Sequence, residues 1–217
     1  MVTMTRREPV PRLRGLYAIT PDWADSRRLL GVTEAILAGG CRLLQYRNKT
    51  ASDCHRQEQA VALRGLTRRY GALLIISDDA DLAAFAEADG AHLGEDDGEL
   101  AAARGRLGAG LLGASCYQSL DLARNAARAG ADYLAFGSFF ASPTKPLARR
   151  ADPALLERAR AEFALPVCAI GGITLDNAPS LLAAGADMLA VISALYDAAD
   201  PRAATERFIQ HFEDNSP

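Results

Sequence analysis

Aromatic side chains, lysine and long apolar runs are all scarce in this chain of 217 residues. Aromatics make up 6% of it, too few for a β-sandwich that depends on Tyr and Trp, and the abundant Ala, Gly and Leu suit packed helices and short strands. No apolar run reaches the ~18 to 20 residues that span a bilayer. The basic N-terminus lacks the apolar stretch of a signal peptide. We therefore expect neither membrane insertion nor secretion.

Paired cysteines and excess positive charge are also missing. The four cysteines are scattered and form no CxxC pair: Cys41, Cys54, Cys116 and Cys168. This spacing supports neither a disulfide framework nor a zinc site, and it fits the reducing cytoplasm. The formal net charge of −3 argues against a nucleic-acid partner held by a broad basic face, so any anion must be bound locally. Of the 24 basic residues, only Lys49 and Lys145 are lysines.

One pattern recurs along the chain: a short apolar run, a polar loop, and an Ala/Leu/Arg stretch with helical spacing that ends at Gly or Ala-Gly. The predicted strands are 16–19, 43–46, 73–76, 91–93, 111–114, 133–136, 167–170 and 188–192. The predicted helices are 27–38, 52–69, 80–87, 99–106, 119–129, 153–162, 176–184 and 201–212. Segments 87–94, 128–137 and 183–193 repeat one another, each entering a strand through Asp.

Eight such units predict an α/β fold, a single (β/α)8 TIM barrel, because parallel strands joined by helices cross over right-handedly and a doubly wound sheet more often uses five or six. The third and fourth helices are short, which leaves seven units as an alternative count. No linker divides the chain. We expect one domain over 1–217, with loose ends at 1–12 and 213–217.

Polar residues follow the second predicted strand. Catalytic groups of this fold gather at the C-terminal ends of the strands, so residues at these positions carry the functional prediction. The run is Gln45, Tyr46, Arg47, Asn48 and Lys49. Strand alternation turns Gln45, Arg47 and Lys49 to one side, where three donors face one anion. The alternative is a solvated strand end.

Acidic residues follow the third and fourth predicted strands. They are Asp78, Asp79, Asp81, Glu95, Asp96 and Asp97. Six carboxylates in a partly dehydrated mouth repel one another unless a cation or protonation relieves them. Magnesium fits, because it takes one or two carboxylates plus substrate phosphates, and no Cys or His cluster indicates a softer metal. The alternative is that these acids cap the following helices.

Hydroxyls, a lysine and glycines follow the remaining strands. Ser115 comes after the fifth, Ser142, Thr144 and Lys145 after the sixth, Gly171 and Gly172 after the seventh, and Ile192 and Ser193 after the eighth. Loops after strands 7 and 8 are the usual phosphate site of these barrels. The sequence thus predicts two anion sites, one for a magnesium diphosphate over strands 2 to 4 and one for a monophosphate over strands 6 to 8. His92 is expected to be a core or supporting histidine, and Cys116 lacks the partners of a nucleophile.

Taken together, these residues resemble the thiamine-phosphate synthase (thiamine-phosphate pyrophosphorylase) family. The resemblance runs from Leu16 to Ser193 through LLQYRNK, IISDDADLA, ADGAHLGEDD, LGAS, GADYLAFGSFFASPTK, AIGGIT and AVIS. It implies a Mg²⁺-dependent transferase that joins hydroxymethylpyrimidine diphosphate to hydroxyethylthiazole phosphate with release of pyrophosphate. It also implies a dissociative course through a pyrimidine-methyl cation, with small molecules as the partners.

The resemblance implies a role for each matching residue. Arg47, Lys49 and Lys145 are the catalytic cations, and Asp78 and Asp97 the magnesium ligands. The pyrimidine diphosphate site comprises Gln45, Tyr46, Arg47, Asn48, Lys49, Ser77, Ser115 and Lys145. The thiazole phosphate site comprises Ser142, Pro143, Thr144, Gly172, Ile192 and Ser193.

Three departures from the family pattern affect expected affinity more than reaction type. Ser77 stands where Asn is usual, Glu95 stands where Gln is usual, and residues 146–152 lack a Gly-rich continuation. Two other functions stay open. A thiazole tautomerase needs no diphosphate site and resembles its relatives in a histidine where this chain has Cys116 and Tyr117. A catalytically silent phosphate sensor draws support from Ser77 and Glu95.

Overall fold

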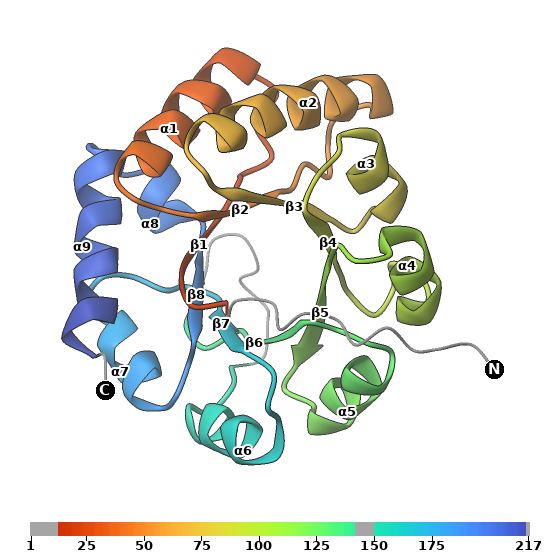
Figure 1. The fold of residues 1–217 in the computed structure, drawn as a ribbon. Helices are drawn as coiled ribbons and strands as arrows, with labels where there is room; N and C mark the ends of the chain where they lie inside the picture. The colour runs from red at the N-terminus through yellow and green to blue at the C-terminus, as the bar shows by residue number, and fades with distance from the viewer. Residues whose placement is uncertain (1–12, 142–149, 216–217) are drawn as a thin grey trace.

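The protein is a closed barrel of parallel strands in the order β1 to β8, with helices packed around the ring (Figure 1). The computed structural model describes residues 13–141 and 150–215. The strands are β1 Gly15–Ile19, β2 Leu43–Tyr46, β3 Leu73–Ser77, β4 Gly90–Leu93, β5 Leu111–Tyr117, β6 Tyr133–Gly137, β7 Val167–Ile170 and β8 Met188–Val191. The predicted (β/α)8 fold and the count of eight strands are confirmed.

The helices follow the expected order. They are α1 Ser26–Ala38, α2 Asp53–Arg69, α3 Ala80–Phe85, α4 Leu100–Leu107, α5 Leu120–Arg128, α6 Ala154–Glu162, α7 Ala178–Ala183, α8 Ser193–Tyr196 and α9 Pro201–Asp214. Side chains of Asp25, Ser52 and Ser119 cap α1, α2 and α5 by accepting a backbone N–H of the first turn. Two expectations are corrected: β5 continues to Tyr117, three residues beyond its predicted end, and the short α8 was not predicted.

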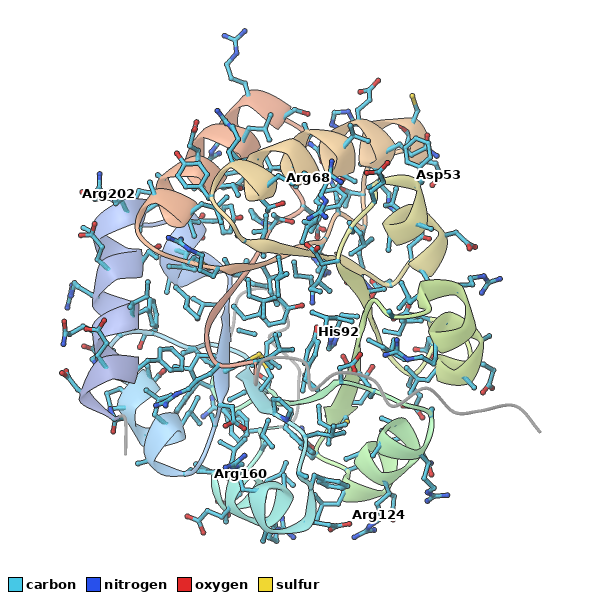
Figure 2. All side chains as sticks on the ribbon, in the orientation of Figure 1. Asp53, Arg68, His92, Arg124, Arg160 and Arg202 are labelled. Carbon is cyan, nitrogen blue, oxygen red and sulfur yellow. The ribbon has the colours of Figure 1, made fainter. Side chains whose placement is uncertain are left out.

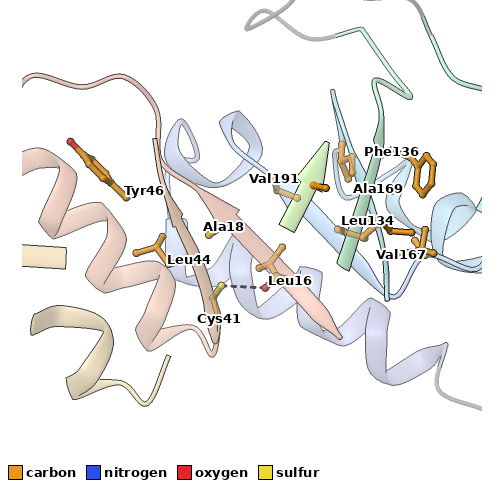
Figure 3. Packing of buried hydrophobic residues seen from close by; sticks show 14 of the residues in the cluster. Leu16, Ala18, Cys41, Leu44, Tyr46, Leu134, Phe136, Val167, Ala169 and Val191 are labelled. Carbon is orange, nitrogen blue, oxygen red and sulfur yellow. Dashed lines mark hydrogen bonds between the residues drawn. The ribbon is translucent and has the colours of Figure 1, made fainter. Parts of the chain in front are cut away.

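Alternate strand residues serve two different cores. On β1, Leu16 and Ala18 pack outward against the helices, whereas Tyr17 and Ile19 fill the barrel interior. Figure 3 shows Leu16 and Ala18 beside Leu44 in the outer layer. Within the described ranges, no helix is both long enough and apolar enough to cross a membrane.

The repeated Asp before three strands has one structural task. Asp89, Asp132 and Asp187 each accept a backbone N–H from the first two residues of the preceding strand, at Leu74, Leu112 and Val167 respectively. Each carboxylate is also paired with an arginine: Arg64 on α2, Arg104 on α4 and Arg160 on α6, the last of which is labelled in Figure 2. The sequence repeat therefore encodes three clamps at the N-terminal end of the barrel.

Candidate active site

The C-terminal ends of the strands surround a cavity of about 500 Å³. Nine residues predicted at the strand ends line it: Gln45, Arg47, Lys49, Ser77, Asp78, Asp97, Ser115, Gly171 and Ile192. Gln45, Arg47 and Lys49 thus turn to one side of β2 and its continuation, as the alternation predicted. The barrel brings together residues more than 50 positions apart in the sequence.

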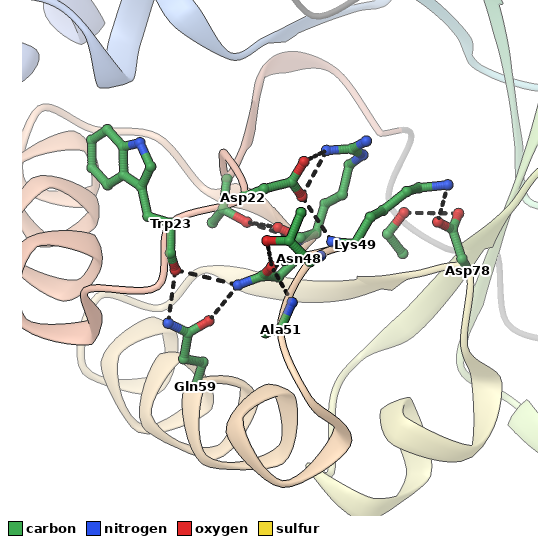
Figure 4. A network of polar contacts seen from close by, with 11 residues as sticks. Asp22, Trp23, Asn48, Lys49, Ala51, Gln59 and Asp78 are labelled. Atoms are coloured by element: carbon green, nitrogen blue, oxygen red, sulfur yellow. Dashed lines mark hydrogen bonds and ion pairs between the residues drawn. The ribbon is translucent and has the colours of Figure 1, made fainter.

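Arg47 and Lys49 are held in place by carboxylates. Arg47 donates through Nη1 to both carboxylate oxygens of Asp22, at 2.9 and 2.8 Å. Asp22 also accepts the backbone N–H of Lys49 at 2.8 Å, and Lys49 Nζ lies 2.8 Å from Oδ2 of Asp78 (Figure 4). Asp22 was missed in the sequence, although it follows the first strand just as the other predicted residues follow theirs.

Asp78 and Asp97, the predicted metal ligands, interact directly through their carboxyl groups. Burial raises the pKa of Asp97, and the neighbouring Asp78 carboxylate adds to that rise. Burial also acts to raise the pKa of Asp78, but hydrogen bonds from Lys49, Asp97 and Ser77 outweigh it and leave this pKa below its ordinary value. Asp78 has a φ of 65°, a strained conformation for a residue other than glycine. The fold therefore holds two carboxyl groups in contact at a strained position, where only one of them ionises readily.

The other four acids of this region have separate tasks or surroundings. Asp79 caps α3 by accepting the backbone N–H of Leu82 at 2.8 Å, and it pairs with Arg56 at 3.0 Å. Asp81 pairs with Arg106 at 3.0 Å. The remaining two, Glu95 and Asp96, are exposed. The capping interpretation thus holds for one of the six.

Tyr46 and Asn48 point away from the main cavity. The Tyr46 hydroxyl donates to Oε1 of Gln59 on α2 at 2.8 Å, and Asn48 Nδ2 donates to the same oxygen at 3.1 Å and to the backbone carbonyl of Trp23. Figure 4 shows the dashed lines from Asn48 to Trp23 and to Gln59. Both residues line a second, polar cavity of about 430 Å³ that also reaches Lys49 and Asp78.

His92 and Cys116 are buried on β4 and β5. Burial lowers the pKa of His92 to about 4, so its imidazole is neutral, and Nε2 lies 2.9 Å from Oγ of Ser115. His92 is a supporting histidine within the ring of strands, as expected (Figure 2). Burial raises the pKa of the Cys116 thiol to about 12, which opposes formation of a nucleophilic thiolate.

A third cavity, of about 300 Å³, lies over the last two strands and is lined by Gly172, Ile192 and Ser193, among others. Gly172 has a φ of +64°, and a Cβ there would lie 2.3 Å from the backbone oxygen of Ala141. Only glycine fits this position. The other predicted residues of this region, Ser142, Pro143, Thr144 and Lys145, lie outside the described residues.

The closed barrel, its charged mouth and the glycine-lined cavity over β7 and β8 are features of a phosphate-handling (β/α)8-barrel enzyme. The family model described as thiamine monophosphate synthase matches residues 16–195. The chain belongs to the thiamine monophosphate synthase family, and this confirms the resemblance and the enzyme class, a thiamine-phosphate-forming transferase.

Related sequences match this one over nearly its whole length. The thiamine-phosphate synthase of Methylobacillus flagellatus is 56% identical over 207 residues, which is 95% of this chain and 99% of the relative. That of Thiobacillus denitrificans is 58% identical over 191 residues, 88% of this chain and 90% of the relative. The solved thiamine phosphate pyrophosphorylase of Pyrococcus furiosus superposes with a TM-score of 0.84 at 37% identity, covering 94% and 97% of the two chains. A 3-hexulose-6-phosphate synthase, at 18% identity and a TM-score of 0.70, shares the fold alone.

Proposed function

We propose that the protein joins hydroxymethylpyrimidine diphosphate to hydroxyethylthiazole phosphate in a Mg²⁺-dependent, dissociative reaction that releases pyrophosphate. The observation that carries the proposal is the convergence of Arg47, Lys49, Asp78 and Asp97 on one cavity in a chain of this family. Two cations and two carboxylates there suit a diphosphate together with a divalent metal ion.

The carboxyl pair fits magnesium. Asp78 and Asp97 offer hard oxygen ligands, and their mutual contact puts two negative groups where a cation relieves the repulsion. In the described ranges, no third His, Cys, Asp or Glu joins them to complete a metal cluster. Magnesium commonly uses one or two carboxylates and takes its other ligands from water and substrate phosphate. When bound, it supplies Lewis-acid stabilisation of the departing diphosphate.

Arg47, Lys49 and Lys145 are proposed to bind the diphosphate. Pyrophosphate leaves readily only when its developing charge is met, and preorganised cations meet that charge without reorganisation. Asp22 orients Arg47 with two hydrogen bonds, which keeps the guanidinium directed at the mouth. Gln45, Tyr46, Asn48, Ser77 and Ser115 complete the proposed pyrimidine diphosphate site.

The second substrate is proposed to bind over β7 and β8. The backbone around Gly172, with Ile192 and Ser193, lines a cavity large enough for a phosphate, and Ser142, Pro143 and Thr144 are proposed to close it. A phosphate held there places the thiazole ring towards the pyrimidine site. Since the carbon–oxygen bond breaks before the ring nitrogen attacks, no protein nucleophile is needed, and positioning supplies much of the rate gain.

One incubation tests the proposal against the two other functions. Pyrophosphate release is measured with both substrates and Mg²⁺, with each substrate alone, and after EDTA. The proposal predicts release only with both substrates and metal. Isomerisation of a thiazole phosphate without pyrophosphate release would indicate a tautomerase, and binding without turnover would indicate a sensor.

We further propose that the enzyme works in the cytoplasm. The support is the sequence's four cysteines without a paired spacing, three of which are buried as free thiols. Fractionation of cells that express a tagged chain tests this, and recovery outside the cytoplasmic fraction would contradict it.

A further inference from the structure

A continuous chain of hydrogen bonds crosses the barrel interior beneath the mouth. It begins at Gln45 on β2, whose Nε2 donates to the hydroxyl of Tyr17 on β1 at 2.7 Å. The Tyr17 hydroxyl lies 2.8 Å from the hydroxyl of Tyr133 on β6. Tyr133 lies 3.1 Å from Nδ1 of His92, and His92 Nε2 lies 2.9 Å from Oγ of Ser115. Five strands thus contribute to one chain that ends at a hydroxyl lining the main cavity.

The amide at the start of this chain sets its direction. Because the Gln45 nitrogen donates to the Tyr17 oxygen, the Tyr17 hydroxyl is free to donate its own proton to Tyr133. Tyr133 then donates to Nδ1 of His92. A neutral imidazole that accepts at Nδ1 carries its proton on Nε2, so His92 donates to Ser115. In this direction every proton along the series of hydrogen bonds has an acceptor. The hydroxyl proton of Ser115 is left to bind a ligand.

With the Gln45 nitrogen facing the Tyr17 oxygen, the opposite direction leaves a buried donor unsatisfied. In it, Ser115 donates to His92, His92 to Tyr133 and Tyr133 to Tyr17. The Tyr17 oxygen then accepts twice, from Gln45 and Tyr133, and its own proton has no acceptor among the hydrogen bonds of the described residues. Tyr17 is 1% exposed, so water does not reach it to compensate. A buried donor without a partner is the costlier state.

Gly113 on β5 leaves space for the hydrogen-bonded side chains of Tyr133 and His92. A Cβ there would lie 2.1 Å from Cζ of Tyr133 and 2.4 Å from Nδ1 of His92. The two rings stack with centroids 5.5 Å apart at an interplanar angle of 30°. The Tyr133 ring also meets the Tyr17 ring edge-on, at a centroid distance of 5.9 Å. Packing therefore fixes the positions of the three rings as well as their hydrogen bonds.

We propose that Gln45, Tyr17 and Tyr133 fix His92 with its proton on Nε2 and thereby preset Ser115 as a hydrogen-bond donor to an acceptor nitrogen of the pyrimidine ring. His92 and the two tyrosines are positioning residues, since they act through Ser115. The inference deepens the proposed function and rests on it for the identity of the ligand. It assigns a specificity rule: the ring must present an unprotonated nitrogen to Ser115.

The first test reads the tautomer directly. In protein labelled with ¹⁵N-histidine, the shifts of the two ring nitrogens distinguish Nε2–H from Nδ1–H. The signals of the two helix histidines are assigned with His55→Asn and His211→Asn variants. We expect His92 to carry its proton on Nε2 in the ligand-free protein. A proton on Nδ1 would overturn the inference whatever the enzyme does with its substrates.

The second test separates positioning from general damage. Tyr133→Phe removes the donor to Nδ1, so His92 is free to populate both tautomers and Ser115 is a donor only part of the time. We expect the KM for the pyrimidine diphosphate to rise about 5-fold, with kcat and the KM for the thiazole phosphate changed less than about 2-fold. Tyr196→Phe is the matched control, because that buried hydroxyl bonds to Thr33 at 3.0 Å outside the interior chain. Equal KM values in the two variants would overturn the inference.

Two amide substitutions sharpen the result. His92→Gln places an N–H near the position of Nε2, whereas His92→Asn places its amide near Nδ1. We expect His92→Gln to retain at least about 5-fold more of kcat/KM than His92→Asn. An unchanged KM for the pyrimidine diphosphate in Ser115→Ala would contradict the proposed contact between Ser115 and the pyrimidine. It would therefore also overturn the inference. If Ser115→Ala raises that KM but His92 carries its proton on Nδ1, only the inference fails.

Discussion

The two ends of the barrel treat charge in opposite ways. At the N-terminal end, Asp89, Asp132 and Asp187 each meet an arginine and a backbone N–H, so all three carboxylates are matched. At the C-terminal end, Asp78 lies against Asp97, a second carboxyl group, and Lys49 beside them is half exposed. The first arrangement stabilises the fold, and the second stores unfavourable charge where a ligand relieves it.

The largest expected effect comes from removing the charge pair at the mouth. Asp78→Ala is expected to lower kcat/KM by roughly 100-fold or more, because one preorganised charge stabiliser is lost. Lys145→Ala is expected to have an effect of the same size. Steady-state kinetics measure both. Asp81→Ala is the control, since Asp81 is exposed and pairs with Arg106 on the surface. Near-normal turnover of Asp78→Ala would contradict the assignment.

Removing one of the three Asp–Arg clamps at the N-terminal end of the barrel is expected to lower stability and to leave activity nearly unchanged. Asp132→Ala removes the acceptor for the Leu112 N–H and leaves Arg104 without this partner, so we expect the free energy of unfolding to fall by about 2 to 4 kcal/mol. Urea denaturation measures it, and kcat is expected to change less than about 2-fold. The control is Asp121→Ala, an exposed acid paired with Arg124. A large loss of kcat in a folded Asp132→Ala protein would break the comparison.

Asp97→Asn is expected to increase stability while it removes activity. Burial and Asp78 raise the pKa of Asp97, so the folded state binds this proton more tightly than the unfolded state. Its contribution to stability is present at low pH and is lost as the pH rises through the raised pKa. In metal-free buffer at pH 7, we expect the Tm of Asp97→Asn to be about 2 to 4 °C higher than that of the wild type. We also expect the variant to lose less stability than the wild type as the pH rises through the raised pKa of Asp97. A Tm of Asp97→Asn below that of the wild type at pH 7 would contradict a repulsion between Asp78 and Asp97.

The smallest effect is expected at Cys116. Its buried thiol has a raised pKa and no role in the proposed reaction, so Cys116→Ala is expected to keep kcat within about 2-fold of the wild type. The measurement is turnover before and after treatment with a thiol reagent. Loss of turnover in the folded variant would restore a nucleophilic role for Cys116.

Local signals made most of the fold predictable. Apolar runs placed β2 and β7 at their observed bounds, and the Asp of each repeat marked the entrance to a strand. The short α8 escaped because four residues carry too little periodicity, and the extension of β5 to Tyr117 escaped because polar residues interrupt its apolar run.

The site was predictable to the extent that position along a strand determines direction. Alternation placed Gln45, Arg47 and Lys49 on one side, and the cavity has them there. Side-chain pairings between strands were not predictable. Asp22 meets Arg47 between the loops after the neighbouring strands β1 and β2, and Tyr17 meets Tyr133 across the interior of the closed barrel. Sequence spacing carries no record of such contacts.

The central claim is that Asp78 and Asp97 hold one divalent cation together with a diphosphate. Electron paramagnetic resonance of Mn²⁺, titrated into the protein with pyrophosphate present, tests it without relying on turnover. The account predicts one Mn²⁺ bound per chain in the wild type, and a Kd at least about 10-fold higher in Asp97→Asn. Equal Mn²⁺ binding by the wild type and Asp97→Asn would contradict it.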